Sequence, residues 1–148
     1  MIKEKEYILN KIKIEGDYKK WIYTTKNGLE FECSIRRNNR SGHLCGYVTL
    51  TPDNDYFGYE YENIPVNCHG GLTYASDNGS DWTIGFDCAH LSDLQPFYNN
   101  MEIYGNTGTY RDMEYVTKEC ESICEQISGK SKSHLRSEKI NVLIENEK

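Results

Sequence analysis

Residues 19–36 read KKWIYTTKNGLEFECSIR, and apolar and polar side chains alternate along this stretch on both sides of Asn27 and Gly28. Such alternation is typical of half-buried β-strands, and an Asn-Gly pair supplies the positive φ angles that a two-residue hairpin turn requires. The stretch therefore predicts an antiparallel hairpin in which Trp21 and Tyr23 belong to the same apolar pattern as the residues after the turn. Those residues are Leu29, Phe31, Cys33 and Ile35.

Further strands are expected on the C-terminal side of this hairpin. Residues 43–50 read as a third strand, and residues 66–74 and 82–87 form a second predicted hairpin. Residues 51–65 are rich in Pro, Asp, Asn and Tyr without a clean period, which predicts a long loop with room for one helical turn. Connections of that length are often functional.

The C-terminal part of the sequence changes to a helical period. Between Tyr110 and Ser128, apolar residues recur at steps of three and four, and Gly129 is placed to end the helix. Thr109 followed by Asp112 resembles a capping box. The apolar stripe consists of Met113, Val116, Cys120, Ile123 and Ile127. The expected fold class is α+β, a mostly antiparallel sheet of about five or six strands with one long C-terminal helix packed on it.

The length of 148 residues suffices for one hydrophobic core and is short for two, so residues 1–128 are expected to form a single α+β domain. Residues 129–148 are expected to be a polar tail, either partly disordered or docked as a short edge strand. The N-terminal MIKEKEYILNK lacks the apolar core of a secretory signal, and no stretch is apolar enough for a membrane helix. A cytoplasmic protein without a membrane partner is therefore expected.

The acidic balance argues against a nucleic-acid partner. The net charge is −6, whereas proteins that bind a nucleic-acid backbone usually present a basic surface. The basic cluster RRNNR at 36–40 is interpreted as a solvated turn rather than a phosphate-contacting patch. Twelve tyrosines against four phenylalanines suit a polar pocket for a small molecule. The sequence leaves open whether the chain forms a homo-oligomer.

The six cysteines are expected to be thiols in a reducing cytoplasm. They include no CxxC pair and their spacing with the histidines is poor for a tetrahedral zinc site, so neither a metal nor a cofactor is predicted. Cys88 beside His90 resembles a thiol nucleophile with its base, but no third group nearby would orient them. Small buried apolar residues are the preferred interpretation.

The second predicted hairpin joins HGGLTY at 69–74 to WTIGFD at 82–87. Because a one-residue slip would move every side chain to the opposite face, the apolar pattern selects the register, and Leu72 is placed opposite Ile84. The other face then carries the pairs Thr73–Thr83, Gly71–Gly85 and His69–Asp87. Two opposed glycines would leave a notch in that face, into which a ligand can approach closely.

A histidine and an aspartate at the border of such a notch make a candidate site. Asp87 would fix the imidazole tautomer of His69, and His90 begins the next loop close enough to join them. Alternatively, the glycines let the helix pack closely and the pair is an ordinary polar contact. The candidate catalytic residues are His69, Asp87 and His90; the candidate ligand-binding residues are His69, Gly70, Gly71, Thr73, Thr83, Gly85, Asp87, His90 and Arg111.

At these residues the sequence resembles a family of small proteins of bacteriophages and mobile elements of Gram-positive bacteria. The resemblance covers residues 30–128 and rests on CGYV at 45–48, HGGLTY at 69–74, GFDCAH at 85–90 and a helix that starts with Tyr110-Arg111 and carries Glu119. It implies an intracellular accessory protein of phage type, for which sequestering or destroying a host immune nucleotide is a common task.

Three functions follow as expectations. The first is a binding module that holds a small nucleotide-derived signal in a pocket built by HGGLTY and GFDCAH, with tyrosines available for stacking. The second is a hydrolase of phosphodiesterase type that uses His69, Asp87 and His90. The third is a protein inhibitor of a host enzyme, which needs no pocket.

Overall fold

The computed structural model of the protein describes residues 2–98 and 108–128. Its elements in chain order are α1 (Ile2–Glu15), β1 (Tyr18–Thr24), β2 (Glu30–Arg37), β3 (Leu44–Leu50), the 3-10 helix η1 (Tyr61–Asn63), β4 (Tyr74–Asp77), β5 (Trp82–Asp87) and α2 (Met113–Ser128). The predictions for Gly129 and for the tail at 129–148 lie outside the described residues. Within the described ranges, neither α-helix is long and apolar enough to span a membrane.

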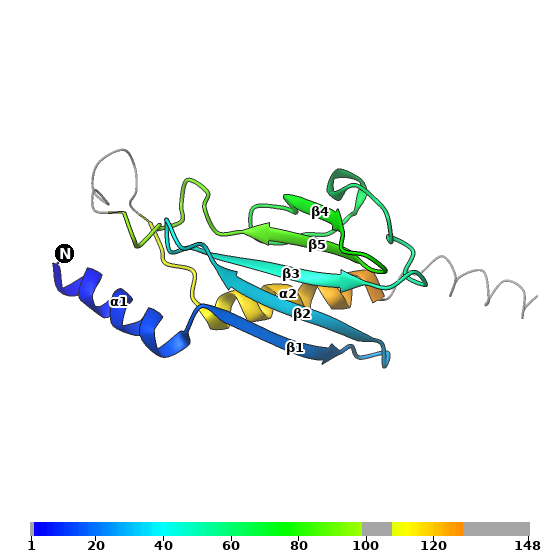
Figure 1. Ribbon diagram of the computed structural model, residues 1–148, viewed down its shortest axis with the longest axis horizontal. Coiled ribbons are helices and arrows are strands. Elements are labelled where there is room, and N and C mark those ends of the chain that lie inside the picture. Colours follow the sequence, from blue (N-terminus) through cyan, green and yellow to red (C-terminus); the bar gives the residue numbers. More distant parts are fainter. Residues whose placement is uncertain (1, 99–107, 129–148) are drawn as a thin grey trace, which may run out of the picture.

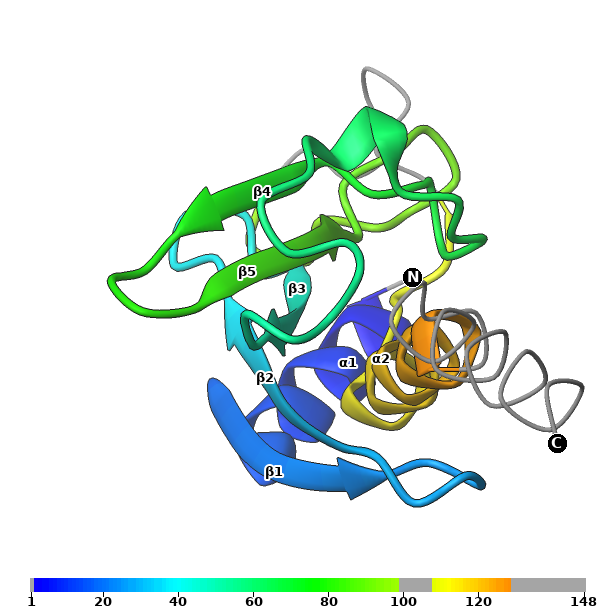
Figure 2. The ribbon, with the colours of Figure 1, turned by 90° about the vertical axis from the view of Figure 1, so that its right-hand side faces the viewer.

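Five antiparallel strands form one sheet in the order β1-β2-β3-β5-β4. α2 crosses one face of the sheet (Figure 1), and no other described helix or strand covers the opposite face (Figure 2), which we call the open face. The expected α+β class, a mostly antiparallel sheet with a C-terminal helix packed on it, is confirmed, although α2 has only 16 residues. Alternate strand residues point onto the open face, among them Arg36, Cys45, Tyr47, Tyr74, Thr83, Gly85 and Asp87.

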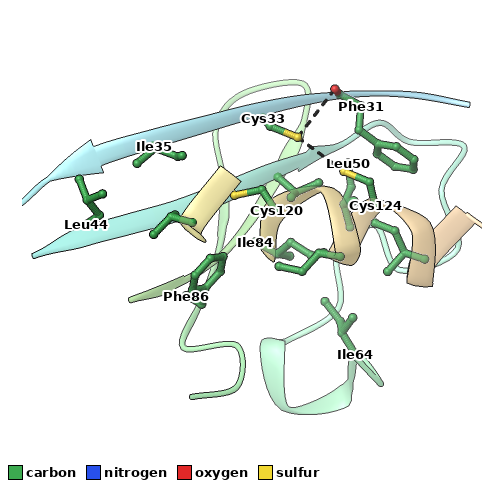
Figure 3. Packing of buried hydrophobic residues seen from close by; sticks show 14 of the residues in the cluster. Phe31, Cys33, Ile35, Leu44, Leu50, Ile64, Ile84, Phe86, Cys120 and Cys124 are labelled. Carbon is green, nitrogen blue, oxygen red and sulfur yellow. Dashed lines mark hydrogen bonds between the residues drawn. The ribbon is translucent and has the colours of Figure 1, made fainter. Parts of the chain in front are cut away.

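The covered face of the sheet holds the core. The predicted stripe of α2 packs on β2, β3 and β5, and Figure 3 shows Cys120 of the helix close to Phe86 and Ile84. Gly46 is a point of close approach, because a Cβ atom there would lie 2.6 Å from the Phe86 ring and 2.7 Å from Cys120 Sγ. A glycine at this position therefore lets the helix and the Phe86 ring pack against β3.

The polar side of α2 is tied to the edge strand β1. Residues 19, 21 and 23 point toward the helix because side chains alternate along a strand, and each donates a hydrogen bond to it. The three bonds run from Lys19 Nζ to Thr117 Oγ1 (3.0 Å), from Trp21 Nε1 to Glu121 Oε2 (3.1 Å) and from Tyr23 Oη to Glu125 Oε2 (2.9 Å). α2 is thus fixed along the sheet by polar contacts as well as by its apolar stripe.

The first hairpin forms as predicted, but its turn is longer. β1 and β2 are joined by residues 25–29 rather than by Asn27 and Gly28 alone. The hydroxyl of Thr25 accepts a hydrogen bond from the N–H of Leu29 (3.1 Å), and Gly28 adopts φ +88°. This side-chain bond stabilises the wider turn, and Leu29 is left exposed instead of joining the apolar surface.

α1 is an element that the sequence pattern does not predict, because its apolar residues are few and charges occur all along it. Ile8 and Ile12 form a small second cluster with Leu94. Lys11 Nζ also donates to Oδ2 of Asp112 (2.6 Å), which is the residue immediately before α2. The helix therefore docks through one short apolar row and a few polar contacts.

The second hairpin has a different register from the predicted one. Its first strand is β4 rather than residues 66–74, and Tyr74, not Gly71, pairs with Gly85. The predicted pairs Thr73–Thr83, Gly71–Gly85 and His69–Asp87 are therefore wrong. Gly70 and Gly71 adopt φ +66° and +79°, which turns the chain and delays the start of the strand until Tyr74.

Candidate functional site

Asp93 is the centre of a polar group that we call the histidine cluster, which consists of His69, Asp87, His90, Asp93, Arg111 and Tyr115. The Asp93 side chain is fully buried. Oδ2 lies 2.7 Å from His69 Nε2 and accepts the backbone N–H of His90 (3.1 Å), while Oδ1 accepts Arg111 Nε (2.9 Å). Both carboxylate oxygens are thus satisfied by groups from three separate parts of the chain.

The protonation of Asp93 follows from these partners. Burial opposes ionisation, but the hydrogen bonds from His69, Arg111 and the backbone of His90 outweigh it and lower the pKa of Asp93 below its ordinary value. The hydrogen bond to Asp93, opposed by burial, raises the pKa of Arg111 in return. Asp93 is therefore a carboxylate that accepts hydrogen bonds, and it anchors the start of α2 to the end of β5.

His69 is held by its backbone and by both ring nitrogens. Because ionised Asp93 can only accept, His69 Nε2 carries the proton, and Nδ1 accepts the hydroxyl of Tyr115 (2.8 Å). The His69 N–H also donates to Glu119 (2.8 Å). The predicted partner of His69, Asp87, is not its partner here. With no free ring nitrogen, His69 is poorly suited to act as a general base and instead positions the loop on α2.

Asp87 faces His90 at the exit of β5. Its Oδ1 lies 3.4 Å from His90 Nε2, and its oxygens accept the hydroxyl of Thr73 (3.0 Å) and the N–H of Ala89 (3.1 Å). His90 Nε2 is buried and has no hydrogen bond within the described residues. The rings of His69 and His90 are 5.8 Å apart, so the sequence correctly predicts that HGGLTY and GFDCAH converge.

The two glycines of HGGLTY have different roles. A Cβ atom on Gly70 would lie 2.1 Å from His90 Nε2, so the turn lies directly on the imidazole ring. At Gly71 a Cβ atom would have open space around it, but the backbone adopts φ +79°, a conformation that is strained for residues with a side chain. Gly70 thus closes one side of His90, whereas Gly71 forms the turn.

The notch expected at Gly85 is filled by an aromatic ring. Gly85 points onto the open face, and a Cβ there would lie 2.6 Å from the Tyr47 ring and 2.8 Å from the Gly46 carbonyl oxygen. Tyr47 also meets the ring of Tyr74 edge to face, with centroids 5.6 Å apart. The alternative that Gly85 admits the helix is wrong, since α2 packs on the other face.

Thr83 stands apart from the histidine cluster. It pairs with Ser76 and Thr49 toward the other end of β5, and its hydroxyl accepts a bond from Asn78 Nδ2 (2.9 Å). Of the predicted site residues, Thr83 is therefore not brought to His69 and His90. Thr73, by contrast, reaches the cluster through Asp87.

A hollow of about 340 Å³ lies on the open face next to the cluster. Cys45, in its wall, pairs directly with Asp87 of β5, and burial raises the pKa of the Cys45 thiol to about 11. The residues that line the hollow are Arg36, Arg37, Asn38, Asn39, Cys45 and Tyr47. We call this cavity the open-face hollow. The interpretation of RRNNR as a solvated turn misses it, because the hollow depends on strand pairing that the sequence does not display.

Other residues of the site escape sequence reasoning for the same reason. Asp93 and Tyr115 follow His69 at separations of 24 and 46 residues, and no local spacing marks them. His43 lies in the same electrostatic neighbourhood, where burial lowers the pKa of its imidazole. For Asp93 and His43, only the density of Tyr, Asp and His in the connecting loops could have drawn attention to them; Tyr115 lies in α2, where its helical period gives no such signal.

The cysteines of the protein are thiols, and most of them are buried. All six cysteines are free, and burial raises the pKa of Cys88 far above that of an ordinary thiol, which makes it a poor nucleophile. Within residues 2–98 and 108–128, no three His, Cys, Asp or Glu side chains are placed to hold a metal ion together.

Comparison with known proteins finds no matching family model, no matching curated protein and no matching solved structure. Function is therefore inferred from the geometry and chemistry of the site itself.

Proposed function

We propose that the protein binds a small nucleotide-like molecule on the open face, at the end of the sheet where β5 leads into the histidine cluster. The observation that carries this proposal is the open-face hollow, which lies beside the Tyr47–Tyr74 pair and beside Asp87 of the GFDCAH motif. Tyrosine rings, a guanidinium and side-chain hydrogen-bonding groups thus meet at one place that no described helix or strand covers.

The chemistry of these groups suits such a ligand. Tyr74 is an exposed residue (44%), so it can offer its ring to a planar group, and a stacked base gains about 1–3 kcal/mol. The hydroxyl of Thr73 donates to the carboxylate of Asp87 (3.0 Å), so a polar pair borders this edge of the open face. The resemblance to phage proteins extends the proposal to a host signalling nucleotide, sequestered in the host cytoplasm.

The test is to incubate the protein with a panel of cyclic nucleotides and ADP-ribose nucleotides, remove free ligand, and identify the molecules released by heat. We expect one of them to be recovered intact. Tyr74→Ala should weaken its binding about tenfold, because loss of a stacked base costs about 1–3 kcal/mol. Tyr7→Ala, on the exposed side of α1, is the matched control and should bind normally. If the wild-type protein retains no member of the panel, the proposal loses its support.

A hydrolase is the second candidate, and the contact between His90 and Asp87 favours it. A carboxylate 3.4 Å from an imidazole nitrogen can orient that ring as an acid–base group. The same incubation distinguishes the two functions, since a hydrolase would release altered products. His90→Gln should then abolish product formation while ligand is still bound.

A further inference from the structure

We propose that the open-face hollow is a phosphoryl-binding site that takes the phosphate groups of the ligand. This inference rests on the proposed function and adds to it the part of the ligand that enters the hollow. It assigns binding to Arg36 and Asn38 and places Cys45 in the wall of the site, and none of the three belongs to the HGGLTY or GFDCAH motif.

Adjacent arginines in the hollow have different roles because they point to opposite faces of β2. Arg37 has only 2% of its side chain exposed and donates to Asp17, to the carbonyls of Gly16 and Gly42, and to Tyr110. Arg36 is exposed on the open face, lies 5.3 Å from the ring of Tyr18, and forms no ion pair within the described residues. Arg36 is therefore the cation available to an anion in the hollow.

The turn after β2 supplies Asn38 and Asn39 to the lining of the same space. The side-chain oxygen of Asn38 accepts the N–H groups of Arg40 (2.9 Å) and Ser41 (3.1 Å), which fixes the orientation of the amide. The amide nitrogen of Asn38 is left to donate, and donors beside an unpaired guanidinium suit phosphate oxygens.

The size of the hollow and the nearby negative charge are consistent with a phosphoryl group. A volume of about 340 Å³ is at the small end of the range for ligand sites, so it holds the phosphate end of a nucleotide rather than a dinucleotide. Asp87 pairs with Cys45 across the sheet. Its oxygens accept hydrogen bonds from Thr73 and Ala89 and face His90, so they are engaged within the histidine cluster.

The alkylation rates of two half-buried thiols can report whether the open-face hollow is occupied. Cys45 lines the hollow and Cys68 lies in the loop before Gly70, and burial raises the pKa of each to about 11. The other cysteines, Cys33, Cys88, Cys120 and Cys124, are fully buried. Alkylation with N-ethylmaleimide, followed by mass spectrometry of the peptides, therefore compares a site in the hollow with one outside it in the same molecule.

We expect millimolar pyrophosphate to slow the alkylation of Cys45 severalfold relative to Cys68, compared with sodium chloride at equal ionic strength. AMP should do so at lower concentration. Arg36→Gln should abolish the protection. Arg40→Gln removes one positive charge from the turn after β2, outside the lining of the hollow, and should keep the protection.

An unchanged ratio of Cys45 to Cys68 alkylation with pyrophosphate, or equal protection in Arg36→Gln, would overturn the phosphoryl site. Tight nucleotide binding without protection of Cys45 would overturn this site alone and leave the proposed function standing. Protection by pyrophosphate that requires Arg36, without tighter binding of any nucleotide, supports the phosphoryl site and contradicts the proposed function.

Discussion

Asp93 shows how a single buried carboxylate can define a site without lying at its surface. It joins His69 from the loop before β4, the backbone of His90 and Arg111 from the start of α2. The half-buried members of the cluster, Asp87 and His90, are placed by this internal contact. Loss of Asp93 should therefore affect the whole fold before it affects any ligand.

We expect Asp93→Asn to lower the free energy of unfolding by about 3–5 kcal/mol, because the neutral amide no longer compensates the charge of Arg111 and keeps only one of the two acceptor oxygens that His69 and Arg111 use. Urea denaturation measures the effect. Glu114→Gln, in an exposed pair with Lys118, should change stability by less than about 1 kcal/mol. Similar effects of the two substitutions would contradict the central role of Asp93.

The pKa of Asp93 also predicts a pH dependence. Hydrogen bonding lowers this pKa in the folded protein relative to the value of about 3.9 in an unfolded chain. Its stabilisation is fully present above the unfolded-state pKa and is lost as the pH falls through the folded-state pKa. Wild-type protein should therefore lose stability below about pH 4 more steeply than Asp93→Asn. The free energy of unfolding is measured by urea titration of both proteins at a series of pH values. If the prediction is wrong, the two plots of this free energy against pH will be parallel.

The contact between Gly85 and Tyr47 gives a prediction on the open face. Gly85→Ala places a methyl group against the Tyr47 ring and the Gly46 carbonyl, and overpacking of this kind costs about 1–3 kcal/mol. Tyr47→Ala in the Gly85→Ala background should recover part of that loss, which a double-mutant cycle measures. Additive effects would show that the ring does not occupy the space over Gly85.

Among the elements, those with a clear local period could be predicted and those fixed by distant contacts could not. β3, β5 and α2 follow from alternation or from a helical stripe whose members, such as Val116 and Ile123, are buried as expected. The register of β4 could not be predicted, because two positive φ angles before Tyr74 override the apolar pattern. α1 has too weak a stripe to be distinguished from a charged, irregular segment.

The junction between α1 and α2 depends on Asp112. Its Oδ1 accepts the N–H of Tyr115 (2.8 Å) as a helix cap, and its Oδ2 accepts Lys11 Nζ. Lys11 lowers the pKa of Asp112 despite the opposing effect of burial. Asp112→Ala should cost about 0.5–2 kcal/mol through loss of the cap, whereas Asp112→Asn keeps a capping group and should cost less. Thermal unfolding of the two variants compares them.

At the scale of the whole molecule, the covered and open faces differ in chemistry. The covered face holds four of the six thiols, all buried, whereas Cys45 and Cys68 are partly exposed. A thiol reagent should therefore label two cysteines in the folded protein and six in denaturant.

Elemental analysis of the purified protein should find well under one equivalent of zinc. Stoichiometric zinc that is lost in His90→Ala would contradict this.

The position of α2 in the chain has a consequence for biosynthesis. The sheet is complete at Asp87, but the helix that covers its apolar face begins only at Met113. A growing chain therefore carries Val48, Ile84 and Phe86 uncovered until α2 has been synthesised, which makes unfinished chains prone to self-association. A chain ending at residue 112 should elute from size exclusion as aggregates, or be degraded in cells, while the full chain does not. The sheet is therefore protected from aggregation only once α2 has been synthesised and has packed on it.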